Sequence, residues 1–318
     1  MAELALPRLG YGAANVGNLY RAMTDDESSS ILQAAWDEGI RYFDTAPHYG
    51  LGLSERRLGA FLATKPREEY IVSTKVGRML RPNPDGAGML DLANDFAVSA
   101  DTRRVWDFSA DGIRRSIEES LARTGLDRFD VLYLHDPERH SLQEGLDSAL
   151  PALAVLREEG AVDAIGVGSM DTPALLASVE TGMLDLLMVA GRYTLAEQTA
   201  VTDVVPACRA HGVEIVNAAV FNSGLLATDH PGSGARYDYG QVPPQVLARV
   251  QAIADVCRDF GVPLPAAALQ FTLRDDAVRS IVVGGSRPEQ LHQNAEHMRM
   301  SIPEELWQVL ARKKLIPS

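Results

Sequence analysis

Four ionisable side chains in this chain follow segments that read as short buried strands. These segments are 41–44, 70–75 and 130–135. Asp44, Lys75 and His135 each end one of them, and Tyr49 lies five residues beyond Asp44. In a closed barrel of parallel strands, the C-terminal strand ends meet at one mouth, where such barrels carry out their chemistry. The spacing therefore predicts that an aspartate, a tyrosine, a lysine and a histidine converge.

Together these side chains could move a proton at a carbonyl or alcohol oxygen. A tyrosine hydroxyl with a pKa of about 10 is a poor acid or base at neutral pH, but a neighbouring lysine ammonium favours the phenolate. An aspartate keeps that lysine charged, and a histidine can bind the substrate oxygen or relay a proton. No side chain carries a hydride, so a nicotinamide cofactor is implied.

Each of the four residues also has a plainer explanation when it is taken alone. Asp44 could cap a turn, Lys75 could extend its ammonium to solvent, His135 could be a structural histidine and Tyr49 a packed loop aromatic. Independent coincidence becomes improbable only when all four share one face. The interpretation therefore depends on the barrel.

Strand and helix patterns alternate along nearly the whole chain. Helices are expected at 25–39, 54–62, 109–125, 142–160, 172–182, 202–212, 243–261, 265–273 and 288–298. The further strands are expected at 8–13, 162–167, 184–189, 213–217 and 280–283, with 129–135 for the third segment above. Asp25 or Asp26 is expected to cap the first helix, and Ser109 or Asp111 the third. Eight strands separated by helices favour a single (β/α)8 TIM barrel over residues 1–318, not an open sheet.

Two connections, 76–108 and 219–242, are too long to be plain turns. Long loops without regular structure in a compact domain are usually functional or disordered. Both follow strands, so they are expected to overhang the C-terminal mouth, shape a substrate pocket and cover a cofactor.

Composition narrows the choice of partners. The 318 residues carry a net charge of −13 without a dense basic block, which argues against nucleic acid and anionic membrane. Two isolated cysteines and the lack of an apolar run of about 18 residues indicate a reducing, cytoplasmic protein without a membrane span. No cluster with metal-ligand spacing is seen. We expect a small-molecule substrate and a monomer or small homo-oligomer.

The run from Gly39 to Gly50, Gly-Ile-Arg-Tyr-Phe-Asp-Thr-Ala-Pro-His-Tyr-Gly, resembles the signature of the aldo-keto reductase family. The blocks 72–75 and 130–135 match the next two blocks of that family in order. The resemblance implies a TIM barrel that binds NAD(P) in extended form without a Rossmann domain. It also implies that Tyr49 is the acid/base, that Lys75 and Asp44 tune it, and that His135 orients the substrate.

The run 281–290 is similar to the family's last-strand block, which holds the adenosine phosphate. The resemblance implies cofactor contacts from Ser169, Ser223, Gly224, Leu225, Gly284, Gly285, Ser286, Arg287, Gln290 and Asn294. Many NADP-preferring members carry lysine where Gly284 stands and arginine where Gln290 stands. Their absence favours NAD over NADP, although Arg287 could serve a 2′-phosphate. Gly168 and Ala218 also depart from the family's nicotinamide pocket, and Phe221 could supply an apolar wall.

Several stretches resemble one branch, the bacterial aldose 1-dehydrogenases, and pyridoxal 4-dehydrogenases are similar. The implied reaction oxidises the C1 hemiacetal hydroxyl of an L-fucose, L-galactose or D-arabinose type sugar to a lactone. Candidate substrate residues are His48, Trp106, Asp136, Arg192 and Asn222. Asp136 could instead cap the next helix, and Arg192 could form an ion pair. The alternatives are an NADPH-dependent aldehyde or ketone reductase, an accessory subunit of a membrane channel, and a metal-dependent barrel enzyme.

Overall fold

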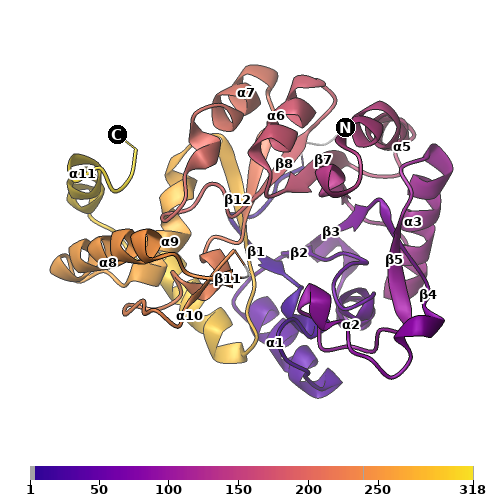
Figure 1. The fold of residues 1–318 in the computed structure, drawn as a ribbon, viewed down its shortest axis with the longest axis horizontal. Coiled ribbons are helices and arrows are strands. Elements are labelled where there is room, and N and C mark those ends of the chain that lie inside the picture. Colours follow the sequence, from indigo (N-terminus) through magenta and orange to yellow (C-terminus); the bar gives the residue numbers. More distant parts are fainter. Residues whose placement is uncertain (1–3, 239, 318) are drawn as a thin grey trace.

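A closed barrel of eight parallel strands forms the centre of the computed structural model, which describes residues 4–238 and 240–317 (Figure 1). The strands are β1 (Leu9–Gly12), β2 (Tyr42–Asp44), β3 (Ile71–Val76), β6 (Val131–His135), β7 (Ala164–Ser169), β8 (Leu186–Ala190), β9 (Glu214–Ala218) and β12 (Val278–Val283). β1 pairs with both β2 and β12, which closes the barrel. The predicted TIM barrel is confirmed.

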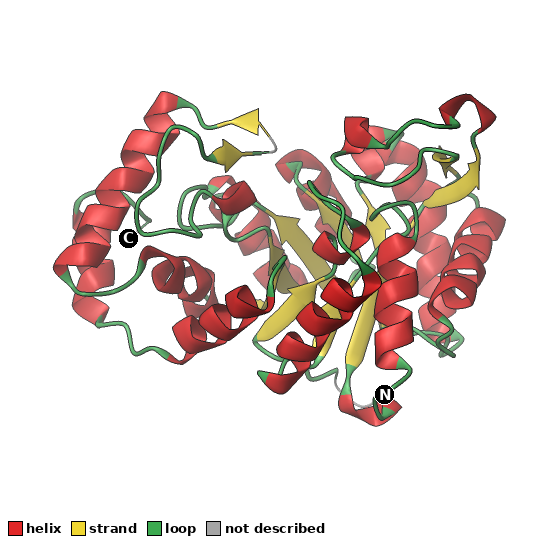
Figure 2. Ribbon diagram, turned by 90° about the horizontal axis from the view of Figure 1, so that it is seen from below, coloured by secondary structure: helices red, strands yellow, loops and turns green. Residues whose placement is uncertain are grey.

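Helices surround the barrel (Figures 1 and 2). They are α1 (Asp25–Asp37), α2 (Leu53–Leu62), α3 (Ala110–Thr124), α4 (Leu142–Glu144), α5 (Leu150–Glu158), α6 (Thr172–Glu180), α7 (Val204–His211), α8 (Pro244–Asp259), α9 (Leu264–Phe271), α10 (Pro288–Arg299) and α11 (Glu304–Arg312). One large apolar core lies between them and the strands, and a smaller one fills the barrel. Among the described helices, we find none whose length and apolar character would suit a membrane span.

Two helix predictions need correction, and one helix was not predicted. The N-cap of α1 is Thr24, which forms a capping box with Glu27, and not Asp25 or Asp26. The helix expected over 142–160 is interrupted by a π-helical turn at Gly145–Ala149 just before Pro151, where the wider turn accommodates the proline ring and its missing N–H. Helix α11 was not predicted. Ser109 caps α3, as one of the two predicted alternatives had it.

Neither long connection is the structureless loop that was expected. The first contains the antiparallel strands β4 (Arg78–Pro82) and β5 (Thr102–Trp106). The second contains the short strands β10 (Arg236–Tyr237) and β11 (Gly240–Gln241). Both hairpins lie on the upper side of the molecule in Figure 2, away from the N-terminus.

A buried polar chain links the barrel interior to its mouth. The hydroxyl of Tyr42 lies 3.3 Å from that of Tyr133 and 3.1 Å from Ser73 Oγ. Ser73 Oγ then donates to Asp44 Oδ1 at 2.7 Å. Because these side chains fill the barrel, the structure below Asp44 is packed protein and holds its carboxylate in one orientation.

Candidate active site

Lys75 lies at the centre of the predicted catalytic group. Its Nζ donates to Asp44 Oδ2 at 2.5 Å, to the Tyr49 hydroxyl at 2.9 Å and to the Thr45 carbonyl oxygen at 3.1 Å. The side chains of Lys75 and Asp44 are almost fully buried. The ammonium thus uses three donors on three fixed acceptors. Residues from β2, β3 and the β2–α2 turn meet at one point, as the spacing predicted.

His135, at the end of β6, completes the group. Its ring centroid lies 6.0 Å from that of Tyr49 in an edge-to-face arrangement. Its ring also lies 5.5 Å from that of His48. Phe96, which the sequence did not single out, contacts both Tyr49 and His48. The Tyr49 ring therefore lies among two imidazoles and an apolar ring, and its hydroxyl accepts from the Lys75 ammonium.

The backbone of the β2–α2 turn sets the position of Tyr49. Gly50 has a φ of 61°, and a side chain there would collide with the backbone of Gly17. The turn is tied down further by Ser54, whose hydroxyl donates to the Ala13 carbonyl oxygen at 2.7 Å. Tyr49 is thus carried on a turn that is packed against the β1–α1 connection.

The pKa values of Lys75 and Tyr49 are both raised. Burial acts against the Lys75 ammonium, but Asp44 and Tyr49 together raise its pKa above the ordinary value. Burial raises the pKa of Tyr49, and Lys75 only reduces that rise. The predicted effect of Lys75, which favours the phenolate, is therefore present, but desolvation of the phenolate is the larger effect.

Burial and nearby cations favour the neutral form of both histidines at the mouth. Burial, followed by the charge of Arg78, lowers the pKa of His48 to about 2. The same two causes hold the pKa of His135 well below its usual range. His48 Nδ1 is buried without a hydrogen-bond partner among the described residues. An imidazole with an unused ring nitrogen beside Tyr49 is suited to bind a substrate hydroxyl.

Two of the other predicted substrate residues lie at this mouth. Asp136 pairs with Arg78, and its Oδ2 lies 3.7 Å from His135 Nε2. Its side chain makes no capping hydrogen bond to the following 3₁₀ turn, which removes that alternative. The Trp106 ring stacks on His140 and lies 4.5 Å from the Arg78 guanidinium carbon. The β4–β5 hairpin therefore reaches the catalytic group through Arg78.

The remaining two predicted substrate residues are engaged in structural contacts. Arg192 forms an ion pair with Asp238 at 2.9 Å, the plainer of its two predicted roles. Asn222 is buried, accepts a hydrogen bond from Thr194 Oγ1 at 2.6 Å and donates to the Gly191 carbonyl oxygen. Both hold the β8 and β9 loops together, so neither is free to read a sugar without giving up these contacts.

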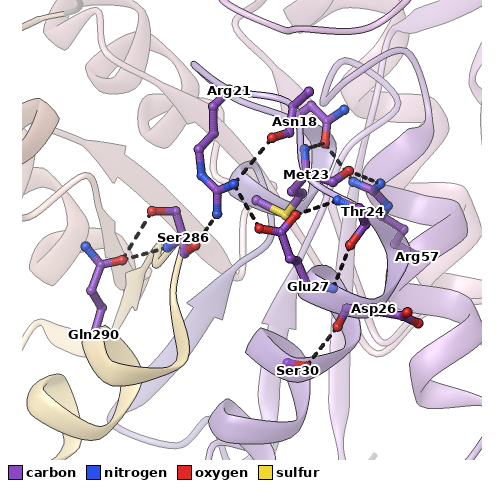
Figure 3. A network of polar contacts seen from close by, with 11 residues as sticks. Asn18, Arg21, Met23, Thr24, Asp26, Glu27, Ser30, Arg57, Ser286 and Gln290 are labelled. Atoms are coloured by element: carbon purple, nitrogen blue, oxygen red, sulfur yellow. Dashed lines mark hydrogen bonds and ion pairs between the residues drawn. The ribbon is translucent and has the colours of Figure 1, made fainter.

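The predicted adenosine-phosphate loop joins β12 to α10 and contacts the β1–α1 connection (Figure 3). Gly284 is exposed and has no side chain that could bind a phosphate. The Ser286 N–H is already engaged, because it donates to Gln290 Oε1 at 2.8 Å. Gln290 thus occupies a backbone N–H group that could otherwise bind the adenosine phosphate. Arg21, which the sequence analysis missed, donates to the Ser286 carbonyl oxygen at 2.9 Å. Together with the exposed Arg287 it gives this loop two cations, which suits a phosphate-bearing cofactor.

Ser223 and Leu225 are predicted cofactor residues that follow β9, and Ser169 is one that ends β7. Ser223 has a φ of 59° in the 3₁₀ turn Asn222–Gly224, and Leu225 beside it is buried. A non-glycine residue in this conformation is strained, as is common at ligand-binding turns. Ser169 Oγ donates to Glu138 Oε1 at 2.8 Å. Glu138, a residue not predicted, keeps a buried oxygen without a partner among the described residues.

The predicted nicotinamide end carries very small residues, Gly168 and Ala218, at its two departures from the family. Gly168 has no side chain, and the Met188 side chain lies beside it. Ala218 is partly buried. Phe221 packs partly against the main core, so it can offer an apolar edge. Asn294 is buried on α10 behind the phosphate loop. Arg21 and Arg287 beside Ser286 would hold the phosphate-bearing end of a dinucleotide, whose nicotinamide would supply the hydride acceptor. In the described part of the chain, no three His, Cys, Asp or Glu side chains are grouped to hold a metal ion.

Known proteins resemble the chain over its full length. The model of the aldo/keto reductase family matches residues 8–314. A D-threo-aldose 1-dehydrogenase from a Pseudomonas species is 61% identical over 100% of this chain and 97% of its own. A pyridoxal 4-dehydrogenase from Microbacterium luteolum is 37% identical over 98% and 95%. A glycerol dehydrogenase structure from Gluconobacter oxydans shares the fold, with a TM-score of 0.76, 23% identity and coverage of 98% and 94%. The chain belongs to the aldo/keto reductase family and is an NAD(P)-dependent oxidoreductase.

Proposed function

We propose that this enzyme oxidises the C1 hemiacetal hydroxyl of an aldose to the corresponding lactone. The observation that carries the proposal is the hydrogen-bonded chain from Asp44 through Lys75 to the Tyr49 hydroxyl at the barrel mouth. The 61% identity to a D-threo-aldose 1-dehydrogenase supports the choice of a sugar substrate. The neutral imidazoles beside Tyr49 support it too, because they suit a hydroxyl-rich ligand.

In the proposed reaction Tyr49 accepts the proton of the C1 hydroxyl as the C1–H bond breaks. A bound nicotinamide dinucleotide supplies the hydride acceptor. Lys75 stabilises the developing phenolate, and Asp44 holds Lys75 in place. His135 binds the reacting oxygen, and His48 offers its unused nitrogen to a neighbouring hydroxyl. The sugar loses one hydride and one proton, which gives the lactone.

The cofactor is proposed to be NAD in preference to NADP. Gly284 and Gln290 bring no cation to the adenosine-phosphate loop. Arg21 and Arg287 lie there, but Arg21 is shared with Glu27 at 3.3 Å. A carboxylate at this place opposes the extra charge of a 2′-phosphate.

An assay of cofactor reduction tests the proposal directly. Purified protein is mixed with NAD⁺ or NADP⁺ and with L-fucose, L-galactose, D-arabinose or pyridoxal, and the product is analysed by mass spectrometry. We expect turnover of a sugar to a product lighter by two hydrogen atoms. Turnover of pyridoxal alone would favour a pyridoxal dehydrogenase. Reduction of aldehydes with NADPH, without any sugar oxidation, would contradict the proposal.

A further inference from the structure

Arg78 is a buried cation at the mouth that lies close to both histidines. It starts β4, three residues after Lys75, and is only 4% exposed. Its guanidinium pairs with Asp136 and lies over the Trp106 ring. Its Nε has no hydrogen-bond partner among the described residues. A fully buried arginine is costly to keep unless it acts on a neighbouring charge.

One carboxylate oxygen connects Arg78 with the catalytic imidazole. Asp136 Oδ2 accepts from Arg78 and also lies 3.7 Å from His135 Nε2. A carboxylate this close to a histidine favours the imidazolium. The guanidinium is always charged and competes for the same oxygen. With Arg78 in place, the Asp136 charge is neutralised before it can draw a proton onto His135.

The other charges around His135 do not replace Arg78. The groups that face it are Lys75 on β3, His48 and Tyr49 after β2, Asp136 and Arg139 after β6, and Asp44 behind Lys75. Lys75 is already held by Asp44 and Tyr49. Arg139 lies 3.9 Å from Asp136, but its side chain is 60% exposed and is therefore screened by solvent.

We propose that Arg78 is a positioning residue that acts through Asp136 to keep His135 as a neutral imidazole. In this form His135 has one donor and one acceptor nitrogen to exchange with the reacting hydroxyl. The proposal relies on the proposed function in one respect, that His135 binds the reacting oxygen. The protonation state of His135 is a property of the protein without substrate.

The test is an NMR titration of ring-labelled histidines in the unliganded full-length protein. The His135 signal is assigned as the one that is lost in the variant His135→Asn. We expect the wild-type signal to stay neutral down to acid unfolding. In Arg78→Gln the His135 pKa should rise by at least about one pH unit, because the Asp136 carboxylate then acts unopposed. The conservative Arg78→Lys should keep most of the low pKa. Arg103→Gln, which removes an exposed cation from the neighbouring strand β5, should leave it unchanged.

A double variant separates the route through Asp136 from a general loss of structure. In Arg78→Gln/Asp136→Asn the opposing carboxylate is gone as well, so the His135 pKa should lie clearly below that of Arg78→Gln, and above the wild-type value only by the direct effect of the Arg78 charge. A folded Arg78→Gln protein with an unchanged His135 pKa would overturn the proposal. So would a double variant whose pKa is raised as far as that of Arg78→Gln. If Arg78→Gln does not fold, the double variant is compared with Asp136→Asn, and a large difference between them counts against the proposal.

Activity adds a second readout. In Arg78→Gln the pH profile of sugar oxidation should show an additional loss of rate at acid pH, as His135 becomes protonated, that the wild type lacks. If the wild type does not oxidise sugars at all, the proposed function fails. The NMR titration would still decide the role of Arg78.

Discussion

At the residue scale, the Tyr49 hydroxyl is the group that we propose accepts the proton. Tyr49→Phe removes this oxygen and keeps the ring in contact with Phe96 and His135. We therefore expect kcat for sugar oxidation to fall by about 10²–10⁴-fold with little change in thermal unfolding. Tyr70→Phe, just before β3 at the opposite end of the barrel, is the control and should keep full activity. A Tyr49→Phe enzyme that retains most of its turnover would assign the proton transfer to another group.

The raised pKa of Tyr49 gives a pH dependence of defined sign. Burial favours the neutral hydroxyl, so the phenolate forms only as pH rises through a value above the ordinary one. Oxidation, which needs a base, should therefore become faster with rising pH. Lys75→Met removes the charge that opposes this rise, so the rising limb should move to still higher pH. Kinetics over the alkaline range measure the displacement.

The same substitution leaves the buried Asp44 without its partner. Breaking a buried pair in this way costs about 3–5 kcal/mol, so unfolding must be measured beside the rates. Asp44→Asn/Lys75→Met removes both charges and should recover part of the stability while keeping the alkaline shift. Lys65→Met, whose ammonium lies over Trp36 away from the mouth, serves as the control. An unshifted pH profile in both Lys75 variants would exclude Lys75 as the group that tunes Tyr49.

Residue types and spacing were sufficient to predict the catalytic group but not its surroundings. Asp44, Lys75 and His135 are at or next to strand ends, so the fold alone brings them together. Arg21, Arg78 and Glu138 reach the site by ion pairs and hydrogen bonds across elements far apart in sequence. Nothing in local spacing distinguishes them from surface residues. The same limit applies to the pKa of Tyr49, because the burial that raises it depends on the packed structure.

At the element scale, the start of α1 shows how a cap is selected. Thr24 Oγ1 accepts from the Glu27 N–H at 3.1 Å, and Glu27 Oε2 accepts from the Thr24 N–H at 2.7 Å. Asp25 is instead paired with Arg57. Thr24→Ala should lower the free energy of unfolding by about 1 kcal/mol. Asp26→Ala, in the same first turn, should cost less because it removes only a favourable interaction with the helix dipole. Urea unfolding of the two variants measures the difference, and equal losses would contradict the assignment of Thr24.

Element types were predicted better than element ends and loop contents. Apolar periodicity located the barrel strands and most helices, because core-facing side chains recur at fixed spacing. The β4–β5 hairpin was missed. Its strands are only partly buried and pair with each other outside the barrel, so they lack that periodicity. Helix α11 has the pattern in Leu306, Trp307 and Leu310, which are buried, so a further pass along the sequence could have found it.

At the scale of the whole molecule, closure of the barrel brings its first and last strands side by side. β1 pairs with β12, so the β1–α1 connection lies beside the β12–α10 loop. Arg21 links the two by donating to the Ser286 carbonyl oxygen (Figure 3). The alternation of strands and helices was enough to predict this closure. It could not indicate that Arg21, distant in sequence, would enter the predicted phosphate site.

The preference for NAD can be tested at this junction with Gln290→Arg. The substitution places a guanidinium on the first turn of α10, where it can pair with a 2′-phosphate, and removes the acceptor of the Ser286 N–H. A charge-assisted hydrogen bond contributes about 1.5–3 kcal/mol, so affinity for NADP⁺ should increase by roughly 10-fold or more. Affinity for NAD⁺ should fall slightly because the Ser286 N–H loses its hydrogen-bond acceptor.

Glu289→Gln, at the adjacent position, raises the net charge by the same amount and serves as the control for net charge. Titration of each variant with both nucleotides, followed by intrinsic fluorescence, gives the ratio. A wild type that already binds NADP⁺ more tightly than NAD⁺ would show that Arg21 and Arg287 suffice for the 2′-phosphate.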